Sequence, residues 1–482
     1  MESTLFITPS RPLDEISRLI GNGLKKNGLI EKGNPRRANT RFKLSENDYF
    51  VGFSWCYETI PDSVVILLEI SKYYEEEERK KDTPSKLTKP EIINYAKSFK
   101  KYIESEQLPI SEVKIKQFKL SKSLSVEYEL GNKIVSPSKR GALHNPFELR
   151  ALPESIRVYW PAGSLNESDR ACRMLADSLI RFGVRGARMF PELYNNQTLP
   201  LPDNDSFECI IIIPNIEDEL AKPLIVELKK RPRGIHIFDF DDNGNQYKFD
   251  NLAAGILYNS GSELWRVHGL DQNNSIYVGI DLGHDPKLRK SKICMTFIDK
   301  NGRELSEHRY IAEDLPLNEK QQLIGILTDK LEKIQKENGF ENVIIHKDGR
   351  ILENHDTLYY TLKQKFGSVS LIEVVKSNSA FILDPESKMG DIFDFGNFIL
   401  LQTLPFNHLG KCTEPIKIKI LKSDLDRMFL IDNVFKLSKA FCGDSLYADK
   451  KLPITTHIAD RFSSFQTGKT LQSFNIAKKW IK

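Results

Sequence analysis

At 482 residues, the chain is too long for a single hydrophobic core, and domain-size statistics predict about two to four folding units. Its content of 40% hydrophobic and 28% charged residues is typical of a globular protein and excludes a fibrous or largely disordered one. A formal net charge of only +4 does not by itself indicate a nucleic-acid partner, so any such partner must be inferred from local features.

The apolar runs and the cysteines further limit the class of protein to which this chain can belong. The longest apolar runs, such as residues 209–213, have the length of strands and fall short of the roughly 20 residues that a membrane-spanning helix needs, so we expect no membrane partner. The N-terminus lacks a charged segment followed by an apolar one, which predicts a cytoplasmic protein. The 6 cysteines are scattered without a C-x-x-C pair, which predicts reduced core residues.

Residues 1–145 are predicted to form an α+β region of uncertain fold. Amphipathic periodicity predicts helices over residues 12–20 and 89–102, and apolar runs predict strands over residues 50–57 and 63–70. The basic, proline-containing stretch that follows has the composition of a linker, and we place a boundary there.

Residues 150–268 show an alternation of strands and helices. The strands are continuous apolar runs, which is typical of a parallel sheet covered by helices on both faces. The predicted strands are residues 155–160, 209–214 and 234–238, and the predicted helices are residues 167–182 and 220–230.

Residues 270–482 are predicted to form a second α/β unit. An apolar strand that begins at Tyr277 is followed by a second strand at residues 293–298 with a hairpin turn. A long helix over residues 318–338 leads to a strand from Val343, a helix through Leu362 and a strand over residues 369–376. We find no internal repeat and no low-complexity tract in the chain.

Three aspartates in this last unit each follow an apolar run. Asp281 and Asp348 come directly after predicted strands and precede a glycine within two positions, and Asp460 follows the strand-like residues 452–458. Carboxylates that converge from strand ends can hold a pair of Mg²⁺ or Mn²⁺ ions, as two-metal phosphoryl transfer requires. We therefore take Asp281, Asp348 and Asp460 as candidate metal ligands.

Two other interpretations of these residues stay open. An aspartate at a strand end is often a turn or helix-cap residue, because its side chain accepts hydrogen bonds from nearby backbone amides. The sequence Gly279-Ile-Asp-Leu-Gly also resembles the first phosphate loop of the actin, sugar-kinase and heat-shock ATPase superfamily, although His284 and Asp285 depart from that pattern. A nucleotide-hydrolysing protein is therefore a further hypothesis.

Four segments together resemble the PIWI domain of prokaryotic Argonautes, and they occur in the order found in that family. The segments are residues 277–285, 344–350, 371–378 and 452–462, and residues 410–418 match a later family segment less closely. The resemblance covers roughly residues 150–470. It implies an RNase H-like PIWI domain over residues 270–482, preceded by a Rossmann-like MID domain over residues 150–268.

The resemblance also implies an Asp-Glu-Asp-Asp/His catalytic tetrad that binds Mg²⁺ or Mn²⁺. Matched by motif, Asp281 is its first member, Asp348 its third and Asp460 its fourth, with His457 as an alternative fourth member. The second member has no firm motif. Glu319, at the start of the predicted long helix, is our choice, and Glu313 is the alternative to it.

In the MID domain of that family, basic residues hold the 5′ phosphate of a guide strand. Here the basic cluster of Lys229, Lys230, Arg231 and Arg233 ends a predicted helix and is the candidate nucleic-acid contact, although a solvated basic turn has the same composition. Ile225 stands where the family has an aromatic residue. Lys376, at the end of a predicted strand, is a further candidate contact to backbone phosphate, or else an ordinary surface lysine.

The resemblance implies a compact, PAZ-lacking Argonaute that binds a guide RNA or DNA and a complementary target strand. We expect a metal-dependent endonuclease that cleaves the target by two-metal phosphodiester hydrolysis, in defence against invading nucleic acid. The alternative is a catalytically silent subunit that binds guide and target and signals to a partner effector protein. The sequence does not decide between an RNA and a DNA guide, because either can be held through its backbone.

Overall fold

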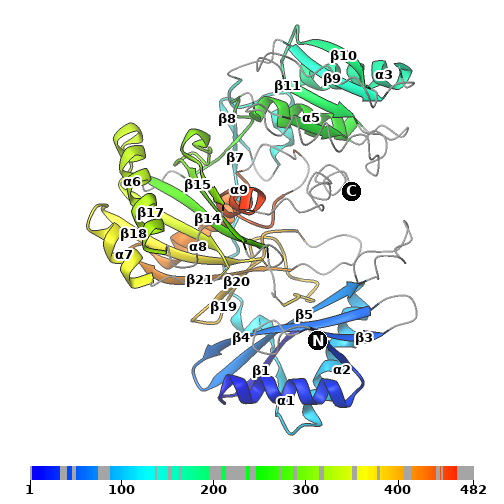
Figure 1. Ribbon diagram of the computed structural model, residues 1–482, viewed down its shortest axis with the longest axis vertical. Helices are drawn as coiled ribbons and strands as arrows, with labels where there is room; N and C mark the ends of the chain where they lie inside the picture. Colours follow the sequence, from blue (N-terminus) through cyan, green and yellow to red (C-terminus); the bar gives the residue numbers. More distant parts are fainter. Residues whose placement is uncertain are drawn as a thin grey trace.

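The computed structural model describes residues 3–463 apart from the segments 33–40, 46–49, 74–86, 136–137, 150–154, 162–164, 195–207, 213–234, 239–245, 260, 271–273, 286–289, 314–319, 350–354, 377–379, 406–413, 441–445 and 447–448. Three α/β bodies follow one another along the longest axis, with an eight-stranded sheet between a four-stranded sheet and an N-terminal sheet (Figure 1). Among the described helices, none is both long and apolar enough to cross a membrane.

The N-terminal body is an antiparallel sheet of six strands in the order β2-β3-β4-β5-β1-β6, with two helices on one face. Side chains alternate between the faces of a strand. In β5, Ile66 and Leu68 therefore pack with Phe99 of α2, whereas Val65 and Leu67 lie in a second cluster on the opposite face. The elements are β1 (Leu5–Pro9), α1 (Leu13–Lys26), β2 (Ile30–Lys32), β3 (Arg41–Ser45), β4 (Phe50–Ile60), β5 (Ser63–Tyr73), α2 (Lys89–Glu104) and β6 (Ser111–Glu112).

The second face of the N-terminal sheet packs against the eight-stranded sheet. Phe393 and Leu400 of the eight-stranded sheet lie in the same buried cluster as Leu67. Glu58 of β4 is buried beside Lys417 and accepts a hydrogen bond from its ammonium. The two bodies therefore share an interior rather than touching only at their surfaces.

A small antiparallel sheet connects the N-terminal part to the rest of the chain. Its order is β13-β7-β8, so that a strand from residues 266–267 pairs with a hairpin that precedes residue 136. Its strands are β7 (Tyr128–Leu130), β8 (Lys133–Val135) and β13 (Arg266–Val267), and the 3-10 helix η2 (Lys139–Leu143) contacts β7. A second 3-10 helix, η1 (Ile115–Phe118), contacts β19 (Ile392–Asp394) of the eight-stranded sheet instead.

The four-stranded sheet has the order β10-β9-β11-β12 and is entirely parallel, as the sequence predicted. The predicted helix over residues 220–230 lies outside the described residues. Strand β10 was not among the predicted strands. It contains Pro191, which is tolerated at the edge of a sheet, where β10 lies. The elements are β9 (Ser155–Pro161), α3 (Leu165–Arg181), β10 (Arg188–Tyr194), β11 (Glu208–Ile212), β12 (Ile235–Phe238) and α5 (Gln246–Asn259).

The eight-stranded sheet is mixed and has the order β16-β15-β14-β17-β18-β21-β20-β19. Its three central strands β14, β17 and β18 are parallel, and their neighbours β15 and β21 are antiparallel to them. The strands are β14 (Ser275–Asp285), β15 (Lys290–Ile298), β16 (Tyr310–Glu313), β17 (Asn342–Asp348), β18 (Ser368–Val375), β19 (Ile392–Asp394), β20 (Ile399–Leu401) and β21 (Ile416–Ser423).

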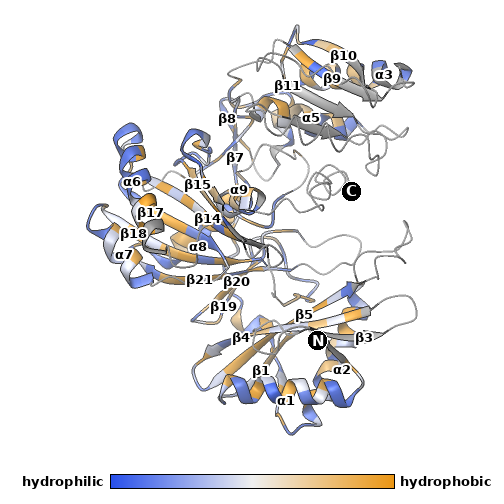
Figure 2. Cartoon of the chain, viewed as in Figure 1, coloured by the Kyte–Doolittle hydropathy of each residue, from blue (hydrophilic) through white to orange (hydrophobic). Residues whose placement is uncertain are grey.

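Helices cover both faces of this sheet. Val278 of β14 packs with Leu331 of α6 and Leu358 of α7 on one face, whereas Tyr277 packs with Leu430 of α8 on the other. Burial on both faces explains why the central strands read as continuous apolar runs, which Figure 2 shows as hydrophobic colouring of β17. The helices are α6 (Lys320–Asn338), α7 (His355–Lys363), α8 (Arg427–Leu437) and α9 (Ile454–Ser463), with a 3-10 turn at η3 (Ser306–His308).

The strand-like prediction for residues 452–458 was wrong, because most of this segment belongs to helix α9. Its β-branched residues favour a strand, but propensity gives way to packing here. Ile454 and Ile458 are one helical turn apart, as are Thr455 and Ala459, and all four are buried. Asp460 therefore lies within a helix rather than after a strand.

Candidate metal centre

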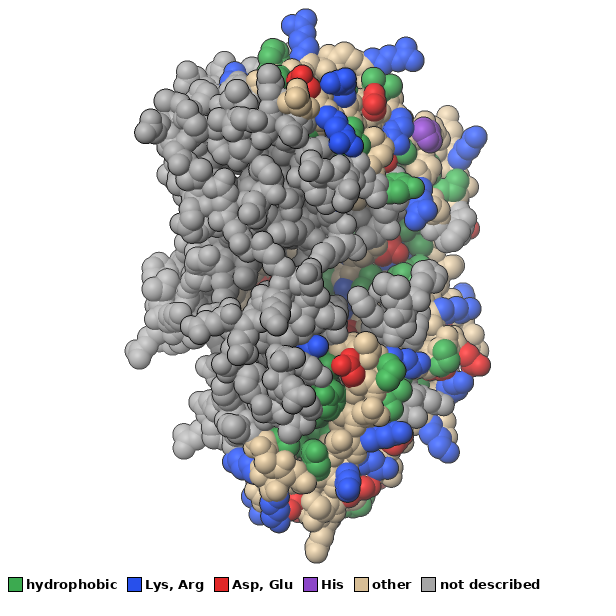
Figure 3. Space-filling model, turned by 90° about the vertical axis from the view of Figure 1, so that its right-hand side faces the viewer, with side chains coloured by type: hydrophobic (Ala, Val, Ile, Leu, Met, Phe, Trp, Pro, Cys, Tyr) green, Lys and Arg blue, Asp and Glu red, His purple; other side chains and the backbone are tan. Residues whose placement is uncertain are grey.

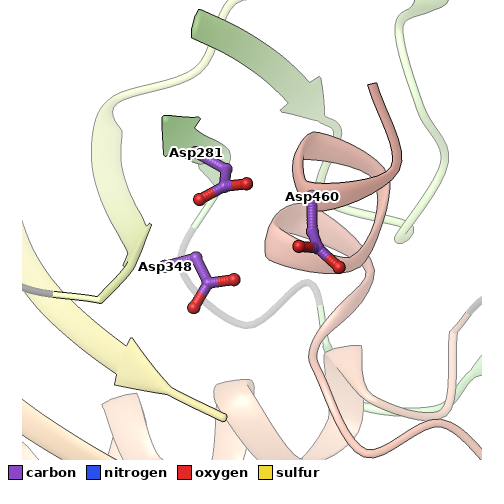
Figure 4. Close-up of side chains that lie close together, drawn as sticks. All are labelled: Asp281, Asp348 and Asp460. Atoms are coloured by element: carbon purple, nitrogen blue, oxygen red, sulfur yellow. The ribbon is translucent and has the colours of Figure 1, made fainter. Parts of the chain in front are cut away.

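The carboxyl groups of Asp281, Asp348 and Asp460 converge at one edge of the eight-stranded sheet (Figure 4). Each residue offers one oxygen, and these oxygens all lie within 4.8 Å of one another. Asp281 is 8% exposed, and the other two are partly buried. The structure therefore brings together three residues that are 67 and 112 positions apart in the chain.

The sheet itself aligns the first two aspartates. Strands β14 and β17 are parallel neighbours, with Ile280 opposite Lys347, so Asp281 and Asp348 each come one residue later on adjacent strands. Gly279 lies two residues before Asp281, and it contacts α9. Because side chains repeat their direction every second residue, both carboxylates point to the face that α9 covers.

Helix α9 brings the third aspartate by packing closely on β14 and β15. The carbonyl oxygen of Thr455 accepts a hydrogen bond from Oγ1 of Thr296 at 3.0 Å, and Oγ1 of Thr455 shares a hydrogen bond with Nδ1 of His346 at 2.9 Å. A Cβ atom on Gly279 would lie 2.2 Å from the same Thr455 carbonyl oxygen, so only glycine fits there. This close contact fixes the part of α9 that precedes Asp460.

A serine from α9 also contacts the first aspartate. Oγ of the buried Ser463 donates a hydrogen bond to Oδ2 of Asp281. On the neighbouring strand, Cys294 lies opposite Asp281, and burial raises the pKa of its thiol to about 12, so it adds no charge at neutral pH. Asp281 is thus held by a neutral hydroxyl, and the residue opposite it on β15 is uncharged at neutral pH.

Lys376, just after β18, lies between the other two aspartates. Its Nζ is 3.0 Å from Oδ2 of Asp348 and also forms an ion pair with Oδ1 of Asp460. The backbone carbonyl of Lys376 accepts a hydrogen bond from Nζ of Lys451 at 2.9 Å, and Lys451 in turn pairs with Glu414 at 2.9 Å. The backbone of Lys376 is therefore anchored, and its ammonium places a positive charge among the carboxylates of the cluster.

The charges of the cluster perturb its ionisation. Burial raises the pKa of Asp348 above its ordinary value, and the nearby Asp281 adds to the effect, whereas the ammonium of Lys376 opposes it. Burial alone would lower the pKa of Lys376, but the carboxylates of Asp460 and Asp348 together raise it. The cluster sets three carboxyl groups against one ammonium, so negative charge is in excess there.

This set of donors fits a hard divalent cation. Mg²⁺ and Mn²⁺ prefer carboxylate oxygens, and the three aspartates supply them from a rigid sheet and a packed helix. The group contains Asp460 and does not contain His457, which lies one turn earlier on α9. Asp460 is thus the better placed of the two residues considered for the fourth tetrad position.

Several residues predicted from the sequence lie outside the described part of the chain. For the second tetrad member, Glu319 falls in an undescribed segment, and Glu313 ends β16 with a side chain that is not described. The candidate phosphate contacts Lys229, Lys230, Arg231 and Arg233 are also outside the described residues. Their roles stay predictions from the sequence.

The sequence did not reveal the residues that seat α9. The signal for Gly279 was present, since a glycine inside a strand often marks the close approach of another backbone. Ser463 and Thr455 gave no such signal, because a serine or threonine in an amphipathic segment has many possible partners. The pairing of Lys376 with two of the aspartates was also not foreseen.

Comparison with known proteins places this geometry in context. No protein-family model matches the chain. Two curated relatives, both named Protein argonaute, are each 28% identical to it. The relative from Marinitoga hydrogenitolerans matches over 293 residues, which is 56% of this chain and 43% of the relative. The relative from Marinitoga piezophila matches over 205 residues, which is 40% of this chain and 30% of the relative. The matched segments thus span less than half the length of these relatives.

Solved structures extend the likeness to nearly the whole chain. Marinitoga piezophila Argonaute in complex with a 5′ OH guide RNA superposes with a TM-score of 0.65 at 16% identity, covering 95% of this chain and 86% of that one. A. aeolicus Argonaute superposes with a TM-score of 0.67 at 14% identity, covering 93% of this chain and 82% of that one. Drosophila Piwi superposes with a TM-score of 0.66 at 11% identity, covering 94% of this chain and 82% of that one.

With its mixed sheet and its parallel sheet, the chain has the fold of the solved Argonaute and Piwi structures. The resemblance to prokaryotic Argonautes predicted from four sequence segments is confirmed by the relatives from two Marinitoga species. The predicted fold class, an RNase H-like PIWI unit preceded by a Rossmann-like MID unit, is confirmed by the solved structures.

Proposed function

We propose that this protein uses a bound guide RNA or DNA to recognise a complementary target strand, and that it cleaves the target by metal-dependent phosphodiester hydrolysis. The observation that carries the proposal is the cluster of Asp281, Asp348 and Asp460 on an Argonaute-like sheet. Marinitoga piezophila Argonaute is known in complex with a 5′ OH guide RNA and target DNA, and Clostridium butyricum Argonaute with a guide DNA and a target DNA. Defence against invading nucleic acid is the role that we propose for this cleavage.

In this proposal each acid has a distinct place. Asp281 and Asp348, on adjacent parallel strands, would share the ions, Asp460 would hold one of them, and Glu319 would complete the set when guide and target are bound. The ions would activate a water molecule and stabilise the leaving oxygen. The seating of α9 on Gly279 keeps Asp460 at a fixed distance from the two strand aspartates, which supports a rigid, preorganised site.

Nucleic acid would be held mainly through its backbone. Sequence would be read by base pairing between guide and target, so the protein needs contacts to phosphates and sugars. Residues 150–268 would form the MID-like unit, with Lys229, Lys230, Arg231 and Arg233 near the guide, and residues 270–482 the PIWI-like unit. Lys and Arg side chains occupy many positions on the described surface at both ends of the molecule (Figure 3), which is compatible with contacts along an extended duplex.

A second function is favoured by one observation, the ion pairs of Lys376. An ammonium that pairs with Asp348 and Asp460 offsets part of their negative charge without a metal. In that case the protein would bind guide and target without cleavage and report the binding to a partner effector protein. The nucleotide-hydrolysing alternative has weaker support, since the fold similarities are to Argonautes.

The test is cleavage of an end-labelled target strand by the full-length protein with Mn²⁺ or Mg²⁺. Guides of RNA and DNA, each with a 5′ phosphate or a 5′ hydroxyl, cover the possible guide chemistries. Asp348→Ala is expected to abolish cleavage and retain target binding. The matched control is Asp356→Ala, which removes an aspartate of α7 that is 50% exposed and paired with Lys422; this variant should cleave normally.

The outcomes separate the two functions. Guide-directed cleavage that depends on Asp348 supports the nuclease. Tight target binding without cleavage under any of these conditions supports the silent subunit. Cleavage that survives Asp348→Ala contradicts the assignment of the site.

A further inference from the structure

The position of Lys376 suggests how metal loading of the site is controlled. Lys376 is anchored through its backbone carbonyl by Lys451, while its side chain, 34% exposed, reaches the carboxylates of Asp348 and Asp460. The third aspartate, Asp281, is bonded instead to the neutral hydroxyl of Ser463. The lysine therefore pairs with two of the three candidate metal ligands, and the third is bonded to a neutral donor.

An ammonium and a divalent cation cannot occupy this place together. Both would use the carboxylates of Asp348 and Asp460, each of which offers one oxygen within 4.8 Å of the other and of one oxygen of Asp281. A cation bound there would also lie close to Nζ, so two positive charges would repel each other in a partly buried site. Because lysine carries its charge on a flexible four-carbon chain, the ammonium can leave without any movement of β18.

We propose that Lys376 is a built-in counter-ion that competes with divalent metal for Asp348 and Asp460, and that a nucleic-acid phosphate releases the metal site by attracting the ammonium. This inference rests on the proposed metal role of the cluster and adds a control of that role. Without nucleic acid, the lysine pairs with Asp348 and Asp460 and offsets part of their negative charge. With a phosphate near the sheet edge, the lysine has an alternative anion, and the three carboxylates become available together.

The size of the competition follows from proton binding. A cation within 4–6 Å of a carboxylate typically weakens proton binding by about 10- to 1000-fold, and a divalent ion feels at least the same repulsion. Removing the charge of Lys376 should therefore raise metal affinity at least about tenfold. Nucleic acid should produce a similar increase in the wild-type protein and little increase in a variant without the lysine.

The experiment measures Mn²⁺ binding to the full-length protein without nucleic acid, by calorimetry and by the electron paramagnetic resonance signal of free Mn²⁺. Lys376→Met keeps the length of the side chain and removes its charge, and Lys376→Gln is a second variant that keeps a hydrogen-bond donor. The matched control is Lys422→Met, which removes a lysine of β21 with a similar exposure of 37% that pairs with Asp356. The same titrations are repeated with a short single-stranded oligonucleotide.

The inference predicts that both Lys376 variants bind Mn²⁺ at least about tenfold more tightly than the wild type, whereas Lys422→Met binds as the wild type does. Equal or weaker Mn²⁺ binding by the Lys376 variants would overturn the counter-ion role and leave the metal site intact. Absence of Mn²⁺ binding in all of these proteins, with and without oligonucleotide, would overturn the proposed metal function as well. Thermal unfolding in each titration shows whether the variants are folded.

Discussion

Substitution of Gly279 by alanine tests whether the seating of α9 decides the geometry of the site. An added Cβ would lie 2.2 Å from the carbonyl oxygen of Thr455 and 2.6 Å from Oγ1 of Thr296. Ordinary contacts begin near 3.4 Å, so the Thr455 backbone has to retreat by about 1.2 Å. A carbonyl within a helix cannot turn aside alone, and α9 must therefore shift with Asp460 on it.

Two effects of different kind are expected from Gly279→Ala. Overpacking of a buried contact costs about 1–3 kcal/mol of unfolding free energy. A misplacement of about 1 Å in a catalytic group lowers a reaction rate by roughly 100-fold. Urea unfolding gives the first quantity, and the single-turnover rate of guide-directed target cleavage gives the second.

The control for this prediction is Gly325→Ala in α6, where an added Cβ meets nothing within 4 Å. Alanine at an exposed helix position stabilises by about 0.5–1 kcal/mol relative to glycine, and the rate of cleavage should not change. If Gly279→Ala were as stable as the wild type and bound Mn²⁺ equally well, α9 would not be seated on β14 through this close contact.

Three further predictions concern buried charges. Burial lowers the pKa of His346 to about 3, so the histidine is neutral in the fold and the protein loses stability as the pH falls below 6.5. His346→Gln should avoid about 3 kcal/mol of that loss between pH 6.5 and pH 4. An equal loss in both proteins, measured by urea unfolding, would refute this prediction. Because burial raises the pKa of Asp348, ionisation of this side chain opposes folding at neutral pH. Asp348→Asn should therefore raise the midpoint of thermal unfolding at pH 7 without metal, and the gain should vanish as the pH falls below 3.8. A lowered midpoint at pH 7 would argue against this prediction. Among the described residues, Lys417→Met leaves the buried Glu58 paired with Lys419 at 3.4 Å, and it should cost about 3–5 kcal/mol of unfolding free energy. Lys419→Met, which removes a side chain that is 37% exposed, should cost about 0–1 kcal/mol. Equal costs would show that the pair is not buried in solution.

Much of the site could be predicted because strands carry regular information. Apolar runs mark the central strands of a covered parallel sheet, and parallel neighbours end at the same edge. Asp281 and Asp348 follow such runs, so their proximity could be expected from the amino-acid sequence alone. The parallel four-stranded sheet could be predicted for the same reason, through its alternation with helices.

The third aspartate shows where local pattern fails. Residues 452–458 are rich in β-branched side chains and read as a strand, yet they fold as part of α9 because Ile454, Thr455, Ile458 and Ala459 bury a helical face against the sheet. The spacing of Ile454 and Ile458 fits a helix as well as a strand, so the sequence alone does not decide. Asp460 nevertheless lies beside Asp281 and Asp348 in the structure.

Lys376 marks a different limit. Its predicted role as a phosphate contact came from its place after a strand, and that role stays a prediction. Its pairing with Asp348 and Asp460 depends on how the end of β18 faces a helix that is 78 residues away, which no local pattern encodes. Contacts of this kind arise only from the packing of elements that are distant in the chain.

The most direct test of the central claim is a crystal structure of the full-length protein with guide, target and Mn²⁺, measured at a wavelength where manganese scatters anomalously. We predict anomalous peaks between the carboxylates of Asp281, Asp348 and Asp460, with the ammonium of Lys376 withdrawn from Asp348. Manganese bound elsewhere, or a cluster without manganese in which Lys376 still bridges two aspartates, would contradict the account.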